Sequence, residues 1–222
     1  MTSDADREAV IDLLGVLAYG ELSGFEALAA DAGQAPDLDD KARLAELAAA
    51  ELRHFALLRD HLALQGVSVG AAMEPFAAPI DQFHARTRPA DWLEGVVKAY
   101  VGNGIALDFY REVASLVAEP ARSLVLEVLD DSGQAEFAVE RVRSAIEEDP
   151  KVAGRLALWG RRIVGEALAQ AQHVVAEREP LARLLMGDGS PDSGLDLAVV
   201  QKLFLRIAEH HSRRMASLGL SA

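Results

Sequence analysis

The chain has 222 residues, half of them hydrophobic, with a formal net charge of −13 and no cysteine. The absence of cysteine excludes disulfides, thiolate metal ligands and cysteine nucleophiles, and is typical of a cytoplasmic protein. The acidic excess argues against nucleic-acid binding through general electrostatics, because phosphate contacts need a basic surface. The N-terminus lacks a signal-peptide pattern, and we expect no membrane-spanning segment.

The first part of the chain predicts two long helices. Residues 5–32 carry apolar side chains at helical spacing, and the Gly-Gln-Ala-Pro stretch at residues 33–36 interrupts the pattern. A second helix is expected over residues 38–65, with an aspartate as its N-cap and Gly66 after its end. The short turn makes these two helices an antiparallel pair.

Residues from about 66 to 90 differ from both helices. Prolines at positions 75, 79 and 89 and glycines at 66 and 70 predict a long irregular crossover. A long connection after an antiparallel pair is what a four-helix bundle with one crossover requires.

The remaining chain predicts further helices and almost no strand. Each begins or ends at a proline or a glycine-rich loop, and the expected ranges are about 91–118, 120–148, 151–178 and 195–217, with a loop at 187–194. We therefore expect an all-α protein with a single domain over residues 1–222. It would combine a four-helix bundle (about 5–148) with two accessory C-terminal helices (about 151–217). The alternative is an extended bundle without a single long crossover.

Candidate metal ligands occur on the first helix pair. Glu51 and His54 lie three residues apart on the apolar face of the second helix, where a carboxylate and an imidazole need a partner. Glu21 falls on the apolar stripe of the first helix. Glu21 and Glu51 both lie fifteen residues from a turn centred near residue 36, so we expect them at the same height.

The second half of the predicted bundle repeats this layout with different residues. Asp108 and Asp131 lie about eleven and twelve residues from the turn near residue 120, and Gln134 follows Asp131 by three positions. If all four acids face one interior, their charges cannot all persist in a low dielectric without cations, shared protons, water or basic groups. The sequence leaves the facing of Lys98 open.

The order of these residues resembles the ferritin-like di-iron carboxylate bundles. The stretch Glu51–Phe55, the stretch Gly102–Val113 and the tail from His211 to Leu220 are similar to an actinobacterial ferritin-like family grouped with the tRNA isopentenyladenosine hydroxylases. The resemblance implies a hydroxylase that uses iron and dioxygen. It also implies that the metal is held by the ligands Glu21, Glu51, His54, Asp108 and Asp131.

This chain departs from the family pattern at one half of the site. Gln134 stands where a ligand histidine is expected, and aspartates replace two glutamates, so the second metal position is degenerate. One or two iron ions are therefore compatible with the sequence, or none if the site is lost. The alternatives to a hydroxylase are a non-catalytic binding or assembly module and a single-metal iron-handling protein.

Partners follow from the same features. The accessory helices have apolar faces that fit a homodimer or another partner, whereas the net charge argues against tRNA. We assign no metal role to the other histidines, which we place at the end of the bundle, in the crossover and on the accessory helices: His61, His84, His173, His210 and His211.

Overall fold

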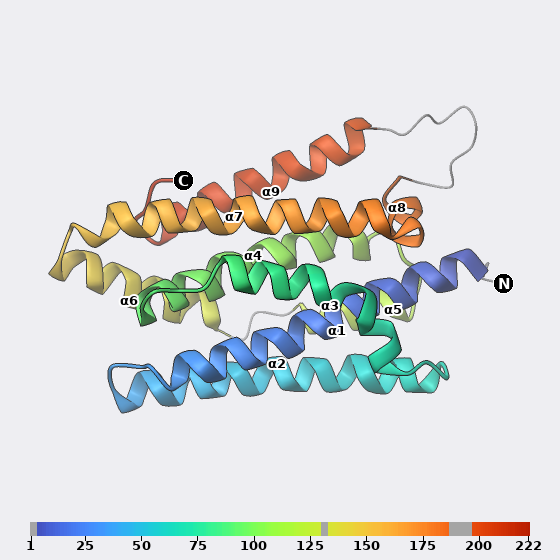
Figure 1. Ribbon diagram of the computed structural model, residues 1–222, viewed down its shortest axis with the longest axis horizontal. Coiled ribbons are helices and arrows are strands. Elements are labelled where there is room, and N and C mark those ends of the chain that lie inside the picture. Colours follow the sequence, from blue (N-terminus) through green and yellow to red (C-terminus); the bar gives the residue numbers. More distant parts are fainter. Residues whose placement is uncertain (1–3, 130–132, 187–196) are drawn as a thin grey trace.

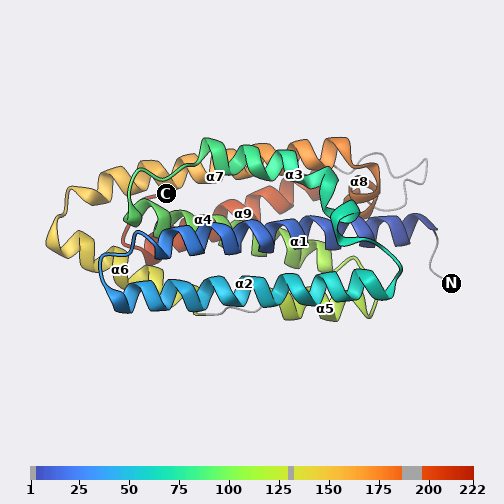
Figure 2. The same cartoon turned by 60° about the horizontal axis from the view of Figure 1, so that its bottom comes forward.

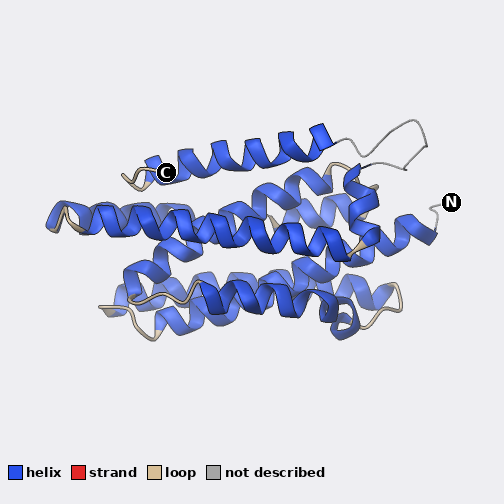
Figure 3. Cartoon of the chain, turned by 45° about the horizontal axis from the view of Figure 1, so that its top comes forward, coloured by secondary structure: helices blue, strands red, loops and turns tan. Residues whose placement is uncertain are grey.

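The computed structural model describes residues 4–129, 133–186 and 197–222. Within these ranges the chain is helical and has no strand (Figure 3), which confirms the all-α prediction. The helices are α1 (Asp4–Ala32), α2 (Leu38–Leu64), α3 (Val69–Arg86), α4 (Trp92–Ala114), α5 (Ala121–Val128), α6 (Gln134–Glu148), α7 (Val152–Glu177), α8 (Glu179–Met186) and α9 (Leu197–Ser217).

Most of the long helices run along the same axis of the molecule (Figure 1). Figure 2 shows them in three layers: α3 and α7 in one outer layer, α1, α4 and α9 in the middle, and α2 and α5 in the other outer layer. Contacts join α1 to α2, α3 and α4, and join α4 to α7 and α9. Helices α1 and α4 therefore form the centre against which the others pack.

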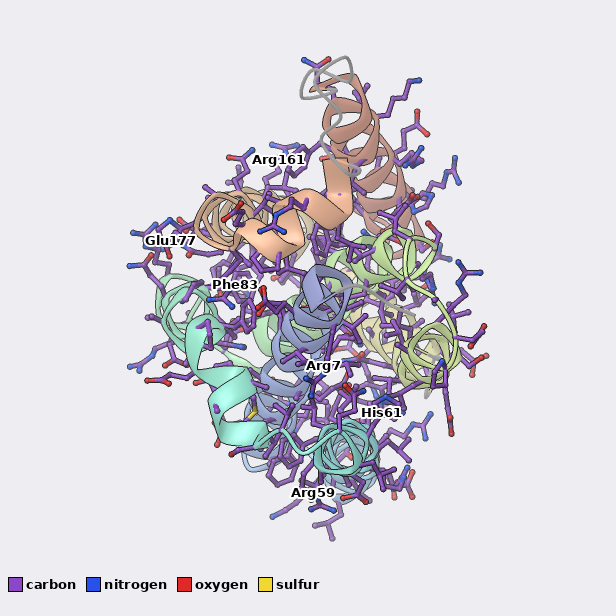
Figure 4. The ribbon with its side chains drawn as sticks, turned by 90° about the vertical axis from the view of Figure 1, so that its right-hand side faces the viewer. Arg7, Arg59, His61, Phe83, Arg161 and Glu177 are labelled. Carbon is purple, nitrogen blue, oxygen red and sulfur yellow. The ribbon has the colours of Figure 1, made fainter. Side chains whose placement is uncertain are left out.

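The α1–α2 hairpin forms as predicted, because local signals mark its ends. The Asp37 side chain caps α2 by accepting a hydrogen bond from the Asp40 backbone N–H at 2.8 Å. Gly66 follows the helix with a φ of 73°, a conformation that glycine adopts without steric cost. At the same end, Arg7 of α1 donates a hydrogen bond to the Gln65 carbonyl at 3.1 Å, and Figure 4 labels Arg7 near His61 in the last turn of α2.

The predicted irregular crossover over residues 66–90 is wrong in conformation. The segment does connect α2 to α4, but most of it is helix α3, with Pro75 and Pro79 inside the helix. A proline in a helix interior removes a backbone hydrogen bond and crowds the preceding turn, which is why the sequence predicted a break.

Packing against α1 offsets the local cost of these prolines. Phe76 of α3 is fully buried, and Ala72 is nearly so. The two backbones approach most closely at Gly15 of α1, where an added Cβ would lie 2.1 Å from the Ala72 carbonyl oxygen. Tertiary contact along this face outweighs the local preference for an irregular chain.

The predicted continuous helix over residues 120–148 is also wrong. The described residues of this stretch form two helices, α5 and α6, with Leu129 and Gly133 outside them and residues 130–132 not described. Gly133, which immediately precedes α6, has a φ of 83° in the left-handed region, and the Arg43 guanidinium donates to its carbonyl oxygen at 3.3 Å. A left-handed residue cannot continue a right-handed helix, so no single helix passes through Gly133.

The C-terminal helices cover the α4 side of the molecule. The expected helix over 151–178 is α7, and the expected helix over 195–217 is α9, whereas the additional short helix α8 begins at Glu179. The predicted loop at residues 187–194 lies outside the described residues. Arg178, at the end of α7, donates two hydrogen bonds to the buried Asp12 carboxylate at 2.5 and 3.0 Å, which ties α7 to α1.

Two hydrophobic clusters form the core. One includes Leu28, Leu44 and Leu47 with residues from α4, α6, α7 and α9, and the other includes Leu17 and Leu58 with residues from α3, α4 and α5. Along both α1 and α2, about two turns of helix separate the residues of one cluster from those of the other. This gap is where the candidate ligands of the first hairpin lie.

One described helix segment, Arg7–Ala32, is long and apolar enough to cross a membrane by length and composition. This criterion concerns length and composition alone, so the absence of a membrane-spanning segment stays a prediction. Half of its most apolar window is buried inside the bundle, and core helices commonly satisfy the same criterion. The observation is weak evidence for a membrane span.

Candidate metal centre

Glu21, Glu51 and His54 converge between α1 and α2, as the hairpin geometry predicts. One potential ligand atom from each lies within 4.8 Å of the others. The His54 Nδ1 lies 3.2 Å from Glu21 Oε2, and the two carboxyl groups are hydrogen-bonded to each other. Gly24, one turn after Glu21, packs against the Glu51 carboxyl group, since a Cβ there would lie 3.4 Å from Glu51 Oε2, in ordinary van der Waals contact.

Burial changes the protonation of these acids. It raises the pKa of Glu21 from the ordinary 4.5 to about 7, although a hydrogen bond with Glu51 partly opposes the increase. Burial, followed by the hydrogen bond and negative charge of Glu21, raises the pKa of Glu51 to about 9. At neutral pH the metal-free pair therefore retains at least one proton, and a bound cation would replace that proton.

The donor set fits a transition-metal ion. Two carboxylates and one imidazole suit the divalent first-row metals, iron included, and three protein ligands leave coordination positions free. Each acid is 8% exposed, and this burial is the main cause of the raised pKa of both.

The two glutamates also line a cavity of about 230 Å³. Its walls come mainly from α1, α3, α4 and α7 and are predominantly apolar, with small residues on several sides. Phe83 of α3 contributes to the wall and is labelled in Figure 4, which views the bundle along its helices. Glu21 and Glu51 thus lie at the wall of a predominantly apolar cavity.

Asp108 does not join this group. Its Oδ2 accepts a hydrogen bond from Arg214 Nη1 at 2.6 Å, and its Oδ1 lies 3.0 Å from His210 Nδ1. Both partners come from α9, which packs on α4 where Gly104 leaves room for the Arg214 side chain. The neighbouring residues Leu107 and Phe109 line the cavity, but Asp108 does not. The structure therefore places Asp108 in an ion-pair cluster between α4 and α9.

Two other residues, Asp131 and Gln134, were expected at the second metal position. Asp131 lies outside the described residues. Gln134, at the position of the expected histidine, does line the cavity, and its Oε1 accepts a hydrogen bond from Asn103 Nδ2 at 2.7 Å. An amide pair therefore stands where the family pattern would place a metal-binding imidazole.

Three polar residues lie at another part of the cavity wall, where the sequence did not place them: Asp31, His84 and Lys98. The spacing Glu21, Gly24, Leu28, Asp31 continues one helical face and could have identified the first. His84 was assigned to an irregular crossover, and only the helical conformation of α3 turns it toward the cavity.

Comparison with known proteins agrees with this architecture. A family described as ferritin-like domain, actinomycetes, matches residues 4–188. Among solved structures, a protein from Synechococcus with aldehyde deformylating oxidase activity has a similar fold, with a TM-score of 0.74 and 20% identity over 99% of this chain and 94% of that one. At that identity the likeness shows the fold alone. No curated protein matches the chain. Because the family match covers most of the sequence, the chain belongs to the ferritin-like domain family of actinomycetes.

Proposed function

We propose that this protein binds one iron ion through Glu21, Glu51 and His54 and oxidises an apolar small molecule held in the adjoining cavity. The observation that carries the proposal is that the two buried glutamates belong both to the convergent ligand group and to the cavity wall. A metal held there would be next to any molecule inside the cavity.

The residues of the chain have distinct roles in this proposal. Glu21 and Glu51 release their shared proton when they bind the cation, because metal ligands must be deprotonated. His54 contributes the imidazole nitrogen that faces Glu21. The apolar walls exclude water from the substrate. When bound, iron with such donors supplies the activation of dioxygen.

We propose a single ion because the residues expected to hold a second ion are hydrogen-bonded to other side chains. The Asp108 carboxylate is bound by Arg214 and His210, and Gln134 is bound by Asn103. The similar fold of an aldehyde deformylating oxidase supports oxidative chemistry in general. The resemblance to tRNA isopentenyladenosine hydroxylases supports a hydroxylation, whereas the net charge of −13 disfavours tRNA itself as the substrate.

Metal analysis tests the proposal. Protein loaded anaerobically with Fe(II) and then desalted should retain one iron per chain, and Glu51→Ala should lose it. Glu46→Ala is a matched control, because Glu46 lies on the same helix with its side chain 71% exposed. Retention of iron by Glu51→Ala, or no retention by the unmodified protein, would contradict the assignment.

A second candidate is a non-catalytic module that binds an apolar ligand without redox chemistry. The engagement of Asp108 and Gln134 in structural hydrogen bonds favours it, because these two positions of the expected second metal site have become part of the packing. Dioxygen consumption by the iron-loaded protein, measured with and without aliphatic ligands, separates the two candidates. Ligand binding without ligand-dependent consumption would support the module.

A further inference from the structure

A second polar cluster lies in the cavity wall away from the metal ligands. It consists of Asp31 of α1, His84 of α3 and Lys98 of α4. Lys98 is 9% exposed, yet its ammonium group makes no hydrogen bond or ion pair within 4.0 Å with the described residues. Its nearest aromatic contact is the Phe83 ring, whose centroid is 5.5 Å from Nζ. A buried cation with unused donors at a cavity wall suits an anionic ligand.

Asp31 helps to keep Lys98 charged but forms no ion pair with it. Burial lowers the pKa of Lys98 to about 8, and the Asp31 charge opposes that decrease, so Lys98 stays mainly protonated at neutral pH. The Asp31 carboxyl group instead packs on α4 at Gly95, where an added Cβ would lie 2.8 Å from Oδ1. Burial and the charge of Lys98 lower the pKa of His84 to about 4, so His84 is a neutral hydrogen-bonding group.

The two polar regions are separated by an apolar stretch. Asp31 and Glu21 are ten residues apart on α1, which corresponds to about 15 Å along the helix. Small side chains line much of the cavity wall between and around them: Gly24, Ala27, Ala99, Gly102, Ala167 and Ala171. These dimensions fit a narrow, extended aliphatic chain better than a broad ring system.

We propose that Lys98 binds the carboxylate of an elongated aliphatic acid whose chain extends through the cavity toward Glu21 and Glu51. Lys98 supplies one ammonium group, and the Asp31 carboxylate near it disfavours a doubly charged phosphate. His84 lines the same cavity and, as a neutral imidazole, carries one N–H donor. The oxidation of the far end of the chain rests on the proposed function, whereas the binding of the acid does not require the metal.

Calorimetric titration of the metal-free protein with dodecanoate, dodecan-1-ol and dodecylamine tests the anchor. Dodecanoate should bind one molecule per chain, and Lys98→Met should weaken it about ten- to a hundredfold, the loss expected for one hydrogen bond to a charged group. Binding of dodecanol should change little in this variant. Lys151→Met is the matched control, because Lys151 is exposed. Equal weakening of acid and alcohol, or no weakening, would overturn the proposal.

Glu51→Gln separates this proposal from the metal assignment. The variant should lose iron and keep dodecanoate binding, whereas Lys98→Met should keep iron and lose dodecanoate binding. Failure of the iron result alone refutes the proposed function, and failure of the dodecanoate result alone refutes the anchor.

A footprint on the unmodified protein avoids any folding defect of the Lys98 variant. Saturating dodecanoate should slow acetylation of Lys98 by acetic anhydride about tenfold or more, as followed by peptide mass spectrometry. It should leave the exposed Lys41 and Lys151 unchanged. Dodecanol at saturation should protect Lys98 less than dodecanoate does. Acetylation of Lys98 at an unchanged rate in dodecanoate would refute the binding site.

Discussion

Replacing Glu51 by glutamine should stabilise the metal-free protein at alkaline pH, although it removes a buried hydrogen-bonded acid. Glu51 is 8% exposed, and its pKa is raised to about 9 by burial and by Glu21. Glutamine has nearly the same shape and stays neutral at every pH. The substitution therefore removes the cost of ionising a buried carboxyl group and retains most of the packing.

The sign follows from proton binding. The folded form of Glu51 has the higher pKa, so it binds more protons than the unfolded form between about pH 4.5 and about pH 9. The contribution of protonated Glu51 to stability is fully present below about pH 4.5 and is lost as the pH rises to about pH 9. At about 1.4 kcal/mol per pKa unit, the contribution of Glu51 to the free energy of unfolding should fall by at most about 4 kcal/mol from about pH 5 to about pH 8.

We therefore expect Glu51→Gln to be more stable than the unmodified protein by about 2–4 kcal/mol at about pH 8. The difference should nearly vanish at about pH 5. For a domain of this size, the alkaline difference corresponds to a Tm increase of about 5–15 °C.

Thermal and urea denaturation of chelator-treated protein at both pH values measures the effect. Glu46→Gln controls for loss of a surface charge on α2, because its side chain is 71% exposed. Fe(II) or Zn(II) should raise the Tm of the unmodified protein and leave that of Glu51→Gln unchanged. Parallel pH profiles for the unmodified protein and Glu51→Gln would refute the reasoning, because they would mean that Glu51 is ionised in both folded and unfolded states.

Three substitutions elsewhere test the packing. Gly15→Ala should destabilise by more than about 2 kcal/mol in urea denaturation, because its Cβ would lie 2.1 Å from the Ala72 carbonyl oxygen. Gly165→Ala, where an added Cβ would meet nothing within 4 Å, should stabilise α7 by about 0.5–1 kcal/mol; a loss of stability there would contradict the structure. Arg214→Ala should cost about 3–5 kcal/mol in the same assay, because it leaves the buried Asp108 carboxylate without its main cation, and a cost below about 1 kcal/mol would show that this pair is solvated.

Local patterns predicted the parts of the site that depend on one hairpin. The turn at residues 33–36 and the capping Asp37 determine where α1 ends and where α2 begins. Counting residues from this turn therefore places Glu21 opposite Glu51. The same counting did not bring Asp108 into the group. Its orientation is decided by Arg214 and His210, which are about a hundred residues away in sequence.

The sequence by itself determined the all-α class, the first hairpin and the face on which Glu21, Glu51 and His54 converge, because helix periodicity and caps act over a few residues. Only the tertiary structure decided that the segment with Pro75 and Pro79 is helical, since packing on α1 outweighs the local cost. It also decided that Asp108 pairs with α9, and that Lys98 faces the cavity at whose wall Glu21 and Glu51 lie. Which side chains meet across helices depends on the long-range packing of the whole chain, which no local pattern specifies.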